Sequence, residues 1–283
     1  MAVELLIEDG SPDWWESLDI WVVPGTDPSG APGTPVVGQP AYLWATVRNE
    51  GDTDASEVQV DFWVANPSIQ IRKSTANHVG TAFADVAAGS SQDVLCLVPW
   101  NVTLVNGGHE CVVVEASSPA DPLSPPPADP DILDAPDYRQ IAQRNLTVAL
   151  AMGTARQELL ISISAGLRAS NTVELEVSEG HPLSRKALAS LGLKARRAVP
   201  DKVAAGLSER SQCGQDRPES HRTLRLEVPR GTSAAAYLGL APQEPLAADE
   251  YAVIKVVGRD QERIVGGLSV VMVQPRERKG GDR

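Results

Sequence analysis

The sequence predicts an all-β protein made of two β-sandwich domains, and three observations lead to this fold class. Apolar and polar side chains alternate along residues 41–48 and again along 58–64, which is the period of a half-buried strand. Further short segments alternate in the same way between turns that contain glycine or proline. The charge of the chain also changes near residue 145, which indicates a boundary between two units.

The stretch 41–64 is the clearest signal, because it reads as two strands joined by a polar turn that contains glycine. In the second strand Val58, Val60 and Phe62 share one face, while Trp63 lies on the other. By the same alternation Val47 belongs to the inner face of the first strand. We therefore expect Val47, Val60 and Phe62 to be buried in a core.

The rest of the first half supplies more short strands at the spacing of a sandwich. They are expected at 3–7, 18–23, 79–83, 93–98, 111–116 and 145–150. Roughly seven strands without helical periodicity are typical of a β-sandwich of immunoglobulin type. The exception is 117–142, which holds seven prolines and five aspartates and is expected to form an exposed loop before the last strand.

The second half is also mainly β, with a short helical insertion at 182–207. Strands are expected at 158–164, 172–177, 223–228, 252–257 and 264–273. One short helix is predicted at 182–191, with proline in its first turn, and another at 202–207 behind Asp201 as its cap. The predicted organisation is a first immunoglobulin-like domain at 1–150, a second sandwich at 151–275 and a disordered basic tail at 276–283.

The two halves differ strongly in charge and in aromatic content. Residues 1–145 hold 21 acidic and 5 basic residues, whereas residues 146–283 hold 16 acidic and 20 basic residues. The halves therefore carry net charges of −16 and +4 within a chain of net −12. All six tryptophans fall in the first 100 residues. Opposite net charges predict that the halves attract one another, within one chain or between chains.

Several short motifs in the first half carry a family resemblance. They are Val47, Asn49 and Gly51 in a VxNxG pattern, the alternating VQVDFWV, the turn Ala88-Gly89, the strand end Val98-Pro99-Trp100, and Gly108-His109 before an apolar strand. Together, over about residues 19–150, they resemble the bacterial cell-adhesion-related (CARDB) type of immunoglobulin-like domain. This resemblance implies a binding or spacer module of surface or secreted proteins without a catalytic centre.

The N-terminus and the cysteines bear on the compartment. Residues 1–10 carry three acids and no basic residue, unlike a signal peptide, so we expect a cytoplasmic protein or one exported without a classical signal. Cys96 and Cys111 lie in consecutive predicted strands, and two buried thiols are favoured over a disulfide. Cys213 falls in a polar loop and is left over.

Motifs of catalysis or of cofactor binding are absent from the sequence. The four histidines are scattered, and no nucleophile elbow, P-loop, HExxH or dinucleotide fingerprint occurs. We therefore expect no enzyme, no metal and no cofactor. The aspartates of 117–142 leave calcium binding as an alternative, although a solvated acidic loop is favoured because prolines break any EF-hand spacing.

Two sets of residues are the candidate contact sites. The aromatic set would stack on a sugar or centre a protein interface, provided the N-terminal segment does not cover it: Trp14, Trp15, Trp44 and Trp63. The basic set would contact an acidic protein surface, with a merely solvated helix face as the alternative: Arg185, Lys186, Lys194, Arg196 and Arg197. The chain is too acidic for a nucleic-acid partner, and no apolar run is long enough to span a membrane.

The sequence thus favours a non-catalytic module that mediates protein–protein contact or assembly, including self-assembly, as part of a larger bacterial assembly. The alternative is a carbohydrate-binding accessory protein that uses outward tryptophans.

Overall fold

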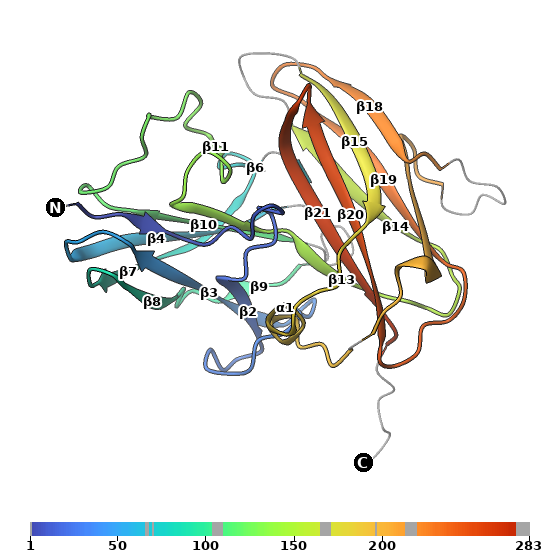
Figure 1. Cartoon of the computed structure of the whole chain (residues 1–283), viewed down its shortest axis with the longest axis horizontal. Helices are drawn as coiled ribbons and strands as arrows, with labels where there is room; N and C mark the ends of the chain where they lie inside the picture. Colours follow the sequence, from blue (N-terminus) through green and yellow to red (C-terminus); the bar gives the residue numbers. More distant parts are fainter. Residues whose placement is uncertain are drawn as a thin grey trace, which may run out of the picture.

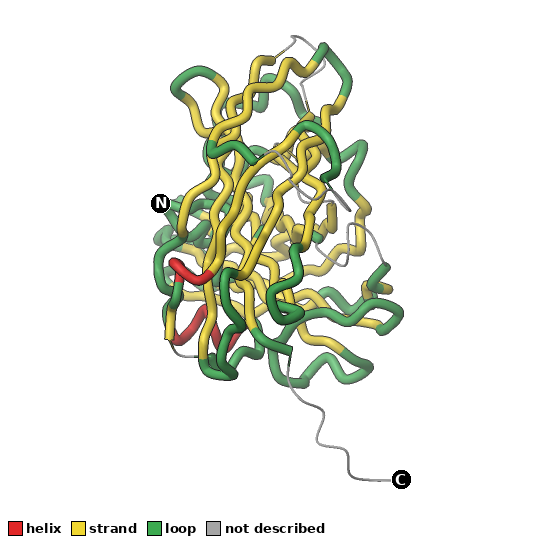
Figure 2. The backbone as a smooth tube through the Cα atoms, turned by 90° about the vertical axis from the view of Figure 1, so that its right-hand side faces the viewer, coloured by secondary structure: helices red, strands yellow, loops and turns green. Residues whose placement is uncertain are grey.

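The computed structural model describes residues 2–65, 68–69, 71–103, 110–164, 171–195, 197–212 and 220–275. Strands make up most of the chain, and the helical part of the described chain is short (Figure 2). The all-β fold class predicted from the sequence is therefore confirmed. Among the described residues no helix is both long and apolar enough to cross a membrane.

The first half forms two larger sheets, here called the first sheet pair, and one two-stranded sheet (Figure 1). In one sheet the central strand β3 (Pro40–Asn49) is flanked by the others: β1 (Leu5–Leu6), β2 (Ile20–Pro24), β8 (Ser90–Leu95) and β9 (Trp100–Asn101). The second sheet has the order β12 (Ile141–Arg144), β10 (Cys111–Ser117), β4 (Ala55–Ala65), β7 (Asn77–Val86). Both sheets are antiparallel.

One hydrophobic core joins these two sheets. Side chains of β3 and β4 alternate between the core and the outside, so Val47, Val60 and Phe62 are fully buried, as the sequence predicted. The Asn49 side chain closes the turn after β3, because its Nδ2 donates to the backbone oxygens of Thr53 (2.8 Å) and Val86 (3.1 Å). The VxNxG pattern is thus explained by hydrogen bonding within the fold.

The second half forms the second sheet pair. One sheet has the order β13 (Leu146–Leu150), β21 (Arg263–Val273), β20 (Glu250–Asp260), β15 (Asn171–Glu179), β18 (Thr223–Val228), with β16 (Arg197–Ala198) also beside β20. The other has the order β17 (Val203–Ser208), β19 (Ser233–Pro242), β14 (Gln157–Ser164), β5 (Ser68–Ile69). A second core, separate from the first, lies between them and includes Ile161, Leu175, Leu238 and Ile254.

Two segments cross from one half of the sequence to the other. The stretch 145–150, expected as the last strand of the first domain, instead pairs as β13 in parallel with β21. Strand β5 of the first half pairs in parallel with β14. The chain therefore passes from the first sheet pair to the second at Asn145, between β12 and β13. The predicted strand at 145–150 is therefore present but pairs with the second half, because alternation identifies a strand but not its partner.

The helical insertion is smaller than predicted. Helix α1 (Arg185–Ser190) is present and capped by Ser184, whose Oγ accepts a hydrogen bond from the Ala187 amide at 3.1 Å. The helix expected at 202–207 is wrong: a 3₁₀ turn, η2 (Pro200–Lys202), leads into strand β17, which pairs with β19. Val203 and Leu207 have helical spacing, yet pairing across the sheet determines the conformation.

The later part of the segment 117–142 covers the first sheet pair instead of projecting from it. Its strand β11 (Ile132–Leu133) pairs with β6 (Ile71–Arg72), and Leu133, Ala135 and Tyr138 are buried. They form a third apolar cluster with Trp14, Trp15 and Trp63. The predicted exposed loop is therefore wrong for 132–142, whose apolar residues cover a sheet face, whereas most of 119–130 is exposed as predicted.

Candidate functional site

The junction between the two sheet pairs centres on Trp15. Its ring is 1% exposed, and its Nε1 donates to Ser269 Oγ of β21 at 3.2 Å. Gly267 of the same strand lies directly beneath the ring, since a Cβ there would be 2.2 Å from the indole. The backbone of Gly267 adds to the contact, because Asn145 Nδ2 donates to its oxygen at 2.7 Å. Trp15 therefore docks the halves and is not an accessible ring.

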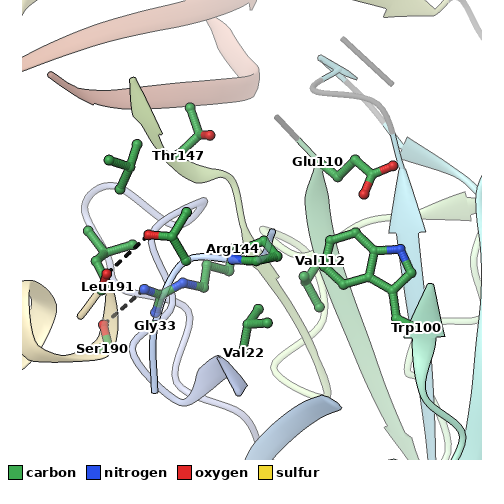
Figure 3. Close-up of a pocket in the computed structure, with 12 residues that line it drawn as sticks. Val22, Gly33, Trp100, Glu110, Val112, Arg144, Thr147, Ser190 and Leu191 are labelled. Atoms are coloured by element: carbon green, nitrogen blue, oxygen red, sulfur yellow. Dashed lines mark hydrogen bonds between the residues drawn. The ribbon is translucent and has the colours of Figure 1, made fainter. Parts of the chain in front are cut away.

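Arg144 ties three segments together at this junction. Its guanidinium donates to the backbone oxygens of Ser17 (3.3 Å) and Ile20 (2.8 Å). It also donates to Ser190 Oγ at 2.9 Å (Figure 3). Burial lowers the pKa of Arg144 to about 10, while the charge of Glu16 acts in the opposite direction. Burial also raises the pKa of Glu16, against the hydrogen bond from Ser269. These charged groups hold the junction together.

A small hollow next to Arg144 contains Glu110 and Trp100 (Figure 3). Its volume is about 30 Å³, which is room for about one water molecule and too little for a substrate. Burial raises the pKa of Glu110 to about 7, and the hydrogen bond from Thr103 Oγ1 at 3.1 Å acts against this shift. Glu110 is the only carboxyl that lines this hollow within the described chain, so no pair of acids faces a substrate here.

The four candidate tryptophans do not form one platform. Trp14, Trp15 and Trp63 are 8%, 1% and 7% exposed, so the expectation of outward, accessible rings is wrong for them. Trp63 does lie on the face opposite Phe62, but the N-terminal segment and 117–142 cover it. Trp44 is half-buried, stacks on Trp21 with 5.7 Å between ring centroids, and donates from Nε1 to the Pro28 oxygen at 3.0 Å.

The predicted basic cluster does not act as one surface. Arg185, Lys186, Lys194 and Arg197 are exposed, and Arg196 lies outside the described residues. Lys186 makes a pair with the buried Asp19 of the first half, 3.6 Å from Nζ to Oδ1. Arg197 pairs instead with Glu250 of its own half. One member of this cluster therefore reaches the acidic half.

Other basic residues of the second half carry most of the attraction between the halves. Lys255 pairs with Asp13, and its Nζ lies 6.0 Å from the centre of the Trp15 ring. Arg263 lies 3.2 Å from Asp134 and 2.8 Å from Asp137. These contacts use acids from the N-terminal segment and from 117–142. The charge difference in the sequence thus corresponds to docking within one chain.

The calcium alternative finds no support in the described part of the chain. The aspartates of 117–142 face arginines: Asp121 faces Arg139, Asp129 and Asp131 face Arg72, and Asp134 and Asp137 face Arg263. Within the described ranges no group of three or more His, Cys, Asp or Glu residues is arranged to hold a metal ion. Cys96 and Cys111 are buried free thiols, as predicted, and Cys213 lies outside the described residues.

The open side of the first sheet pair is a feature that the sequence analysis missed. Strands β7 and β8 are the last strands of their sheets and lie away from the second sheet pair (Figure 1). Between them lies a hollow of about 520 Å³, lined by residues 82–85 and 92–95 and by Leu97. Phe83 and Leu97 are 65% and 75% exposed. The sequence did hold a signal for this exposed surface. Phe83 alternates with Ala82 and Ala84, so a large apolar side chain falls on the outer face when the alanines face inward.

Comparisons with known proteins give only remote likeness. No protein-family model and no curated protein matches the chain. A family 123 glycoside hydrolase from Clostridium perfringens is 12% identical with a TM-score of 0.26, over 46% of this chain and 23% of that one. The CupB6 tip adhesin from Pseudomonas aeruginosa is 10% identical with a TM-score of 0.24, over 97% and 99%. CfaE, the adhesive subunit of the CFA/I fimbria of enterotoxigenic Escherichia coli, is 9% identical with a TM-score of 0.23, over 97% and 94%. Similarity at this level carries no argument about function.

Proposed function

We propose that this chain is a non-catalytic binding module of two immunoglobulin-like sandwiches, the first of CARDB type, and that it takes up a strand of a protein partner along β7. The observation that carries the proposal is the exposed pair Phe83 and Leu97 beside a hollow between two unpaired strand edges. Large exposed apolar side chains that gather at one place mark interaction sites more often than isolated ones do.

Strand β7 lacks lysine, proline and shortness, three of the features that protect a sheet edge, although its ladder with β4 has two register shifts. Edge strands are kept from pairing by lysine, by proline or by shortness. β7 is ten residues long and contains neither lysine nor proline. Within the described chain it pairs with β4 alone, which leaves its outer backbone groups to solvent. A strand added here would gain a ladder of backbone hydrogen bonds.

The hollow fits the side chains of such a strand. Ala82 and Ala84 face inward and are small, which leaves space between β7 and β8. Phe83 lies on the outer face of the same strand, so alternate side chains of the added strand would meet the hollow and the Phe83 ring in turn.

Charge defines the partner more closely. Asp85 and Asp93 line the hollow, within a half of net charge −16. A second copy of the same edge would bring these carboxylates together, which opposes self-pairing. The occupant is therefore an extended apolar segment flanked by lysine or arginine on a different protein.

A peptide titration with the full chain tests this function. The probe is a labelled peptide of alternating valine and threonine with lysines at both ends, followed by fluorescence anisotropy. We expect saturable binding that weakens when the end lysines become glutamates and vanishes when alternate backbone amides are methylated, since methylation removes the ladder donors.

Matched variants locate the binding site. Phe83→Asp should weaken binding by at least tenfold, whereas Met152→Asp, which changes an equally exposed residue (65%) of the second half, should leave it unchanged. Equal binding of the methylated and unmethylated peptides would contradict strand addition. Failure of the lysine-flanked peptide to bind would contradict the proposed partner class.

A further inference from the structure

The outer face of β4 and β7 holds a carboxylate that pairs with no lysine or arginine of the described chain. Asp61 of β4 lies directly opposite Thr81 of β7, and the Thr81 hydroxyl donates to Asp61 Oδ1. His78 Nε2 lies 3.0 Å from the same oxygen, and Gln59 Nε2 donates to Oδ2 at 2.7 Å. Among the described side chains, His78 alone forms an ion pair with Asp61, and a histidine is a cation only when it is protonated.

The strand on the other side of β4 adds negative charge to this face. Glu115 of β10 lies opposite Asp61, so two acids are neighbours across the sheet. Lys73 lies 2.6 Å from Glu115 Oε2 and therefore neutralises Glu115. Like charges on facing residues destabilise a sheet, so a further cation on the β7 side of Asp61 is favourable.

The position of Asp61 connects it to the edge where a strand is proposed to add. Thr81 and Phe83 are two residues apart on the exposed face of β7, so successive outward side chains of an added strand would lie beside Phe83 and then beside Thr81. A long side chain beside Thr81 can reach the carboxylate to which the Thr81 hydroxyl is bonded. The Asp61 side chain is 15% exposed and that of His78 is 47% exposed, so the carboxylate is not sealed from a partner.

We infer that Asp61 selects a lysine or arginine on the outward face of the bound strand, two positions from the residue that lies beside Phe83. This inference rests on the proposed addition of a strand along β7, and it names one residue of the partner. The flanking cations of the partner lie near Asp85 and Asp93, whereas this one lies within the strand. Asp61 is thereby a specificity-determining residue.

His78 makes this contact depend on pH. Histidine gains its charge as the pH falls through the range from 8 to 5. Protonated His78 cancels the charge of Asp61 and repels a lysine of the partner, so acid weakens the preference for lysine. The other charged groups closest to His78 are Lys73, which contacts the same Trp63 ring, and Glu115, and these two neutralise each other.

Fluorescence anisotropy with variants of the valine–threonine peptide tests this inference on the full chain. One internal threonine is replaced by lysine, by norleucine or by glutamate, and the end lysines are kept. At pH 8 the lysine form should bind about fivefold more tightly than the norleucine form, as expected for one ion pair near a surface, and the glutamate form should bind most weakly. Lysine in place of an internal valine would face the hollow and should weaken binding.

The parent peptide separates the two possible failures. If the parent peptide and all its variants fail to bind, both the proposed function and this inference are overturned. If the parent peptide binds but the lysine and norleucine forms bind equally well at pH 8, this inference alone is overturned.

Substitutions then assign the preference to Asp61 and His78. Asp61→Asn should bring the lysine and norleucine forms within twofold of each other, whereas Glu227→Gln, which removes one exposed acid on β18, should keep the preference. If Asp61→Asn does not fold, His78→Lys places a permanent cation beside Asp61 and should remove the preference in the same way. A preference that survives both variants overturns the assignment to Asp61.

A comparison of pH 8 with pH 5.5 tests the role of His78. In the wild type the preference for lysine should fall at least twofold at pH 5.5, and in His78→Gln it should be the same at both pH values. An equal preference at both pH values in the wild type overturns the role of His78.

Discussion

The ring of Trp15 occupies the space above Gly267 in which a side chain would otherwise lie. A Cβ at position 267 would come within 2.2 Å of the ring atoms. Trp15 also donates to Ser269 two residues further along β21, so one residue of the N-terminal segment contacts both positions. The glycine is required here because of this close approach. The contact fixes how the acidic half lies on the basic half.

Gly267→Ala should therefore destabilise the chain. We expect a loss of about 1–3 kcal/mol in the free energy of unfolding, measured by denaturant melting, because the indole is enclosed and cannot move away freely. Gly33→Ala is the control, since its Cβ would have its nearest contact at 3.3 Å and no positive φ is involved. In a Trp15→Leu background the cost of Gly267→Ala should shrink. Costs that simply add would show that the two residues do not interact.

The two phenylalanines of the chain provide a second, matched comparison. Phe62 is fully buried between the sheets, whereas Phe83 is 65% exposed. Phe62→Ala should cost roughly 3–5 kcal/mol of stability. Phe83→Ala should change it by less than about 0.5 kcal/mol. A loss below 1 kcal/mol for Phe62→Ala would mean that β4 presents the other face to the core.

Alternation in the sequence was sufficient to predict β3 and β4 and the face that each presents to the core, but it missed β17 and β19. It placed Phe62 inward and Trp63 on the opposite face, and both assignments agree with the structure. Alternation cannot tell what lies over the outer face. Burial of Trp63 depends on Leu133 and Tyr138, which are distant in sequence and lie among prolines, so the platform of outward tryptophans could not be rejected beforehand.

The sequence also could not predict which residues pair across the junction. The net charges predicted that the halves attract, but Lys255 and Arg263 make the contacts along with Lys186, while the rest of the basic cluster stays on the surface or pairs locally. Lys255 within the apolar strand β20 is a signal of such a contact that the sequence does show, because a buried charge requires a partner. Neither strand β19 nor the pairing of β13 with β21 was predicted, because both depend on contacts between residues that are distant in sequence.

Two lysines at the junction should differ in their contribution to stability. Lys255 is 9% exposed and pairs with Asp13, so Lys255→Gln should cost about 1–3 kcal/mol by leaving that carboxylate without its partner. The Lys186 side chain is 64% exposed, and Asp19 keeps Arg48, so Lys186→Gln should cost less than about 1 kcal/mol. Denaturant melts of both variants check this order. Equal losses would contradict the assignment of the junction to Lys255.

Glu110 should make stability depend on pH. Burial raises the pKa of its carboxyl from 4.5 to about 7, so below pH 4.5 both folded and unfolded states hold the proton. As pH rises from 4.5 to about 7, the unfolded chain releases the proton first, and the free energy of unfolding falls. Glu110→Gln should remove this decline, whereas Glu227→Gln, at an exposed position on β18, should retain it. Parallel pH profiles for wild type and Glu110→Gln would contradict the raised pKa.

The central claim is that the outer edge of β7 accepts a strand, and hydrogen–deuterium exchange of the full chain tests it most directly. In the free protein the outward amides of Asn77–Val86 should exchange fast, because they have no ladder partner within the described chain. With the lysine-flanked peptide at saturation, exchange in Asn77–Val86 should slow, and Phe83→Asp should abolish this protection. Unchanged exchange in Asn77–Val86 at saturating peptide, or protection confined to the second sheet pair, would contradict the account.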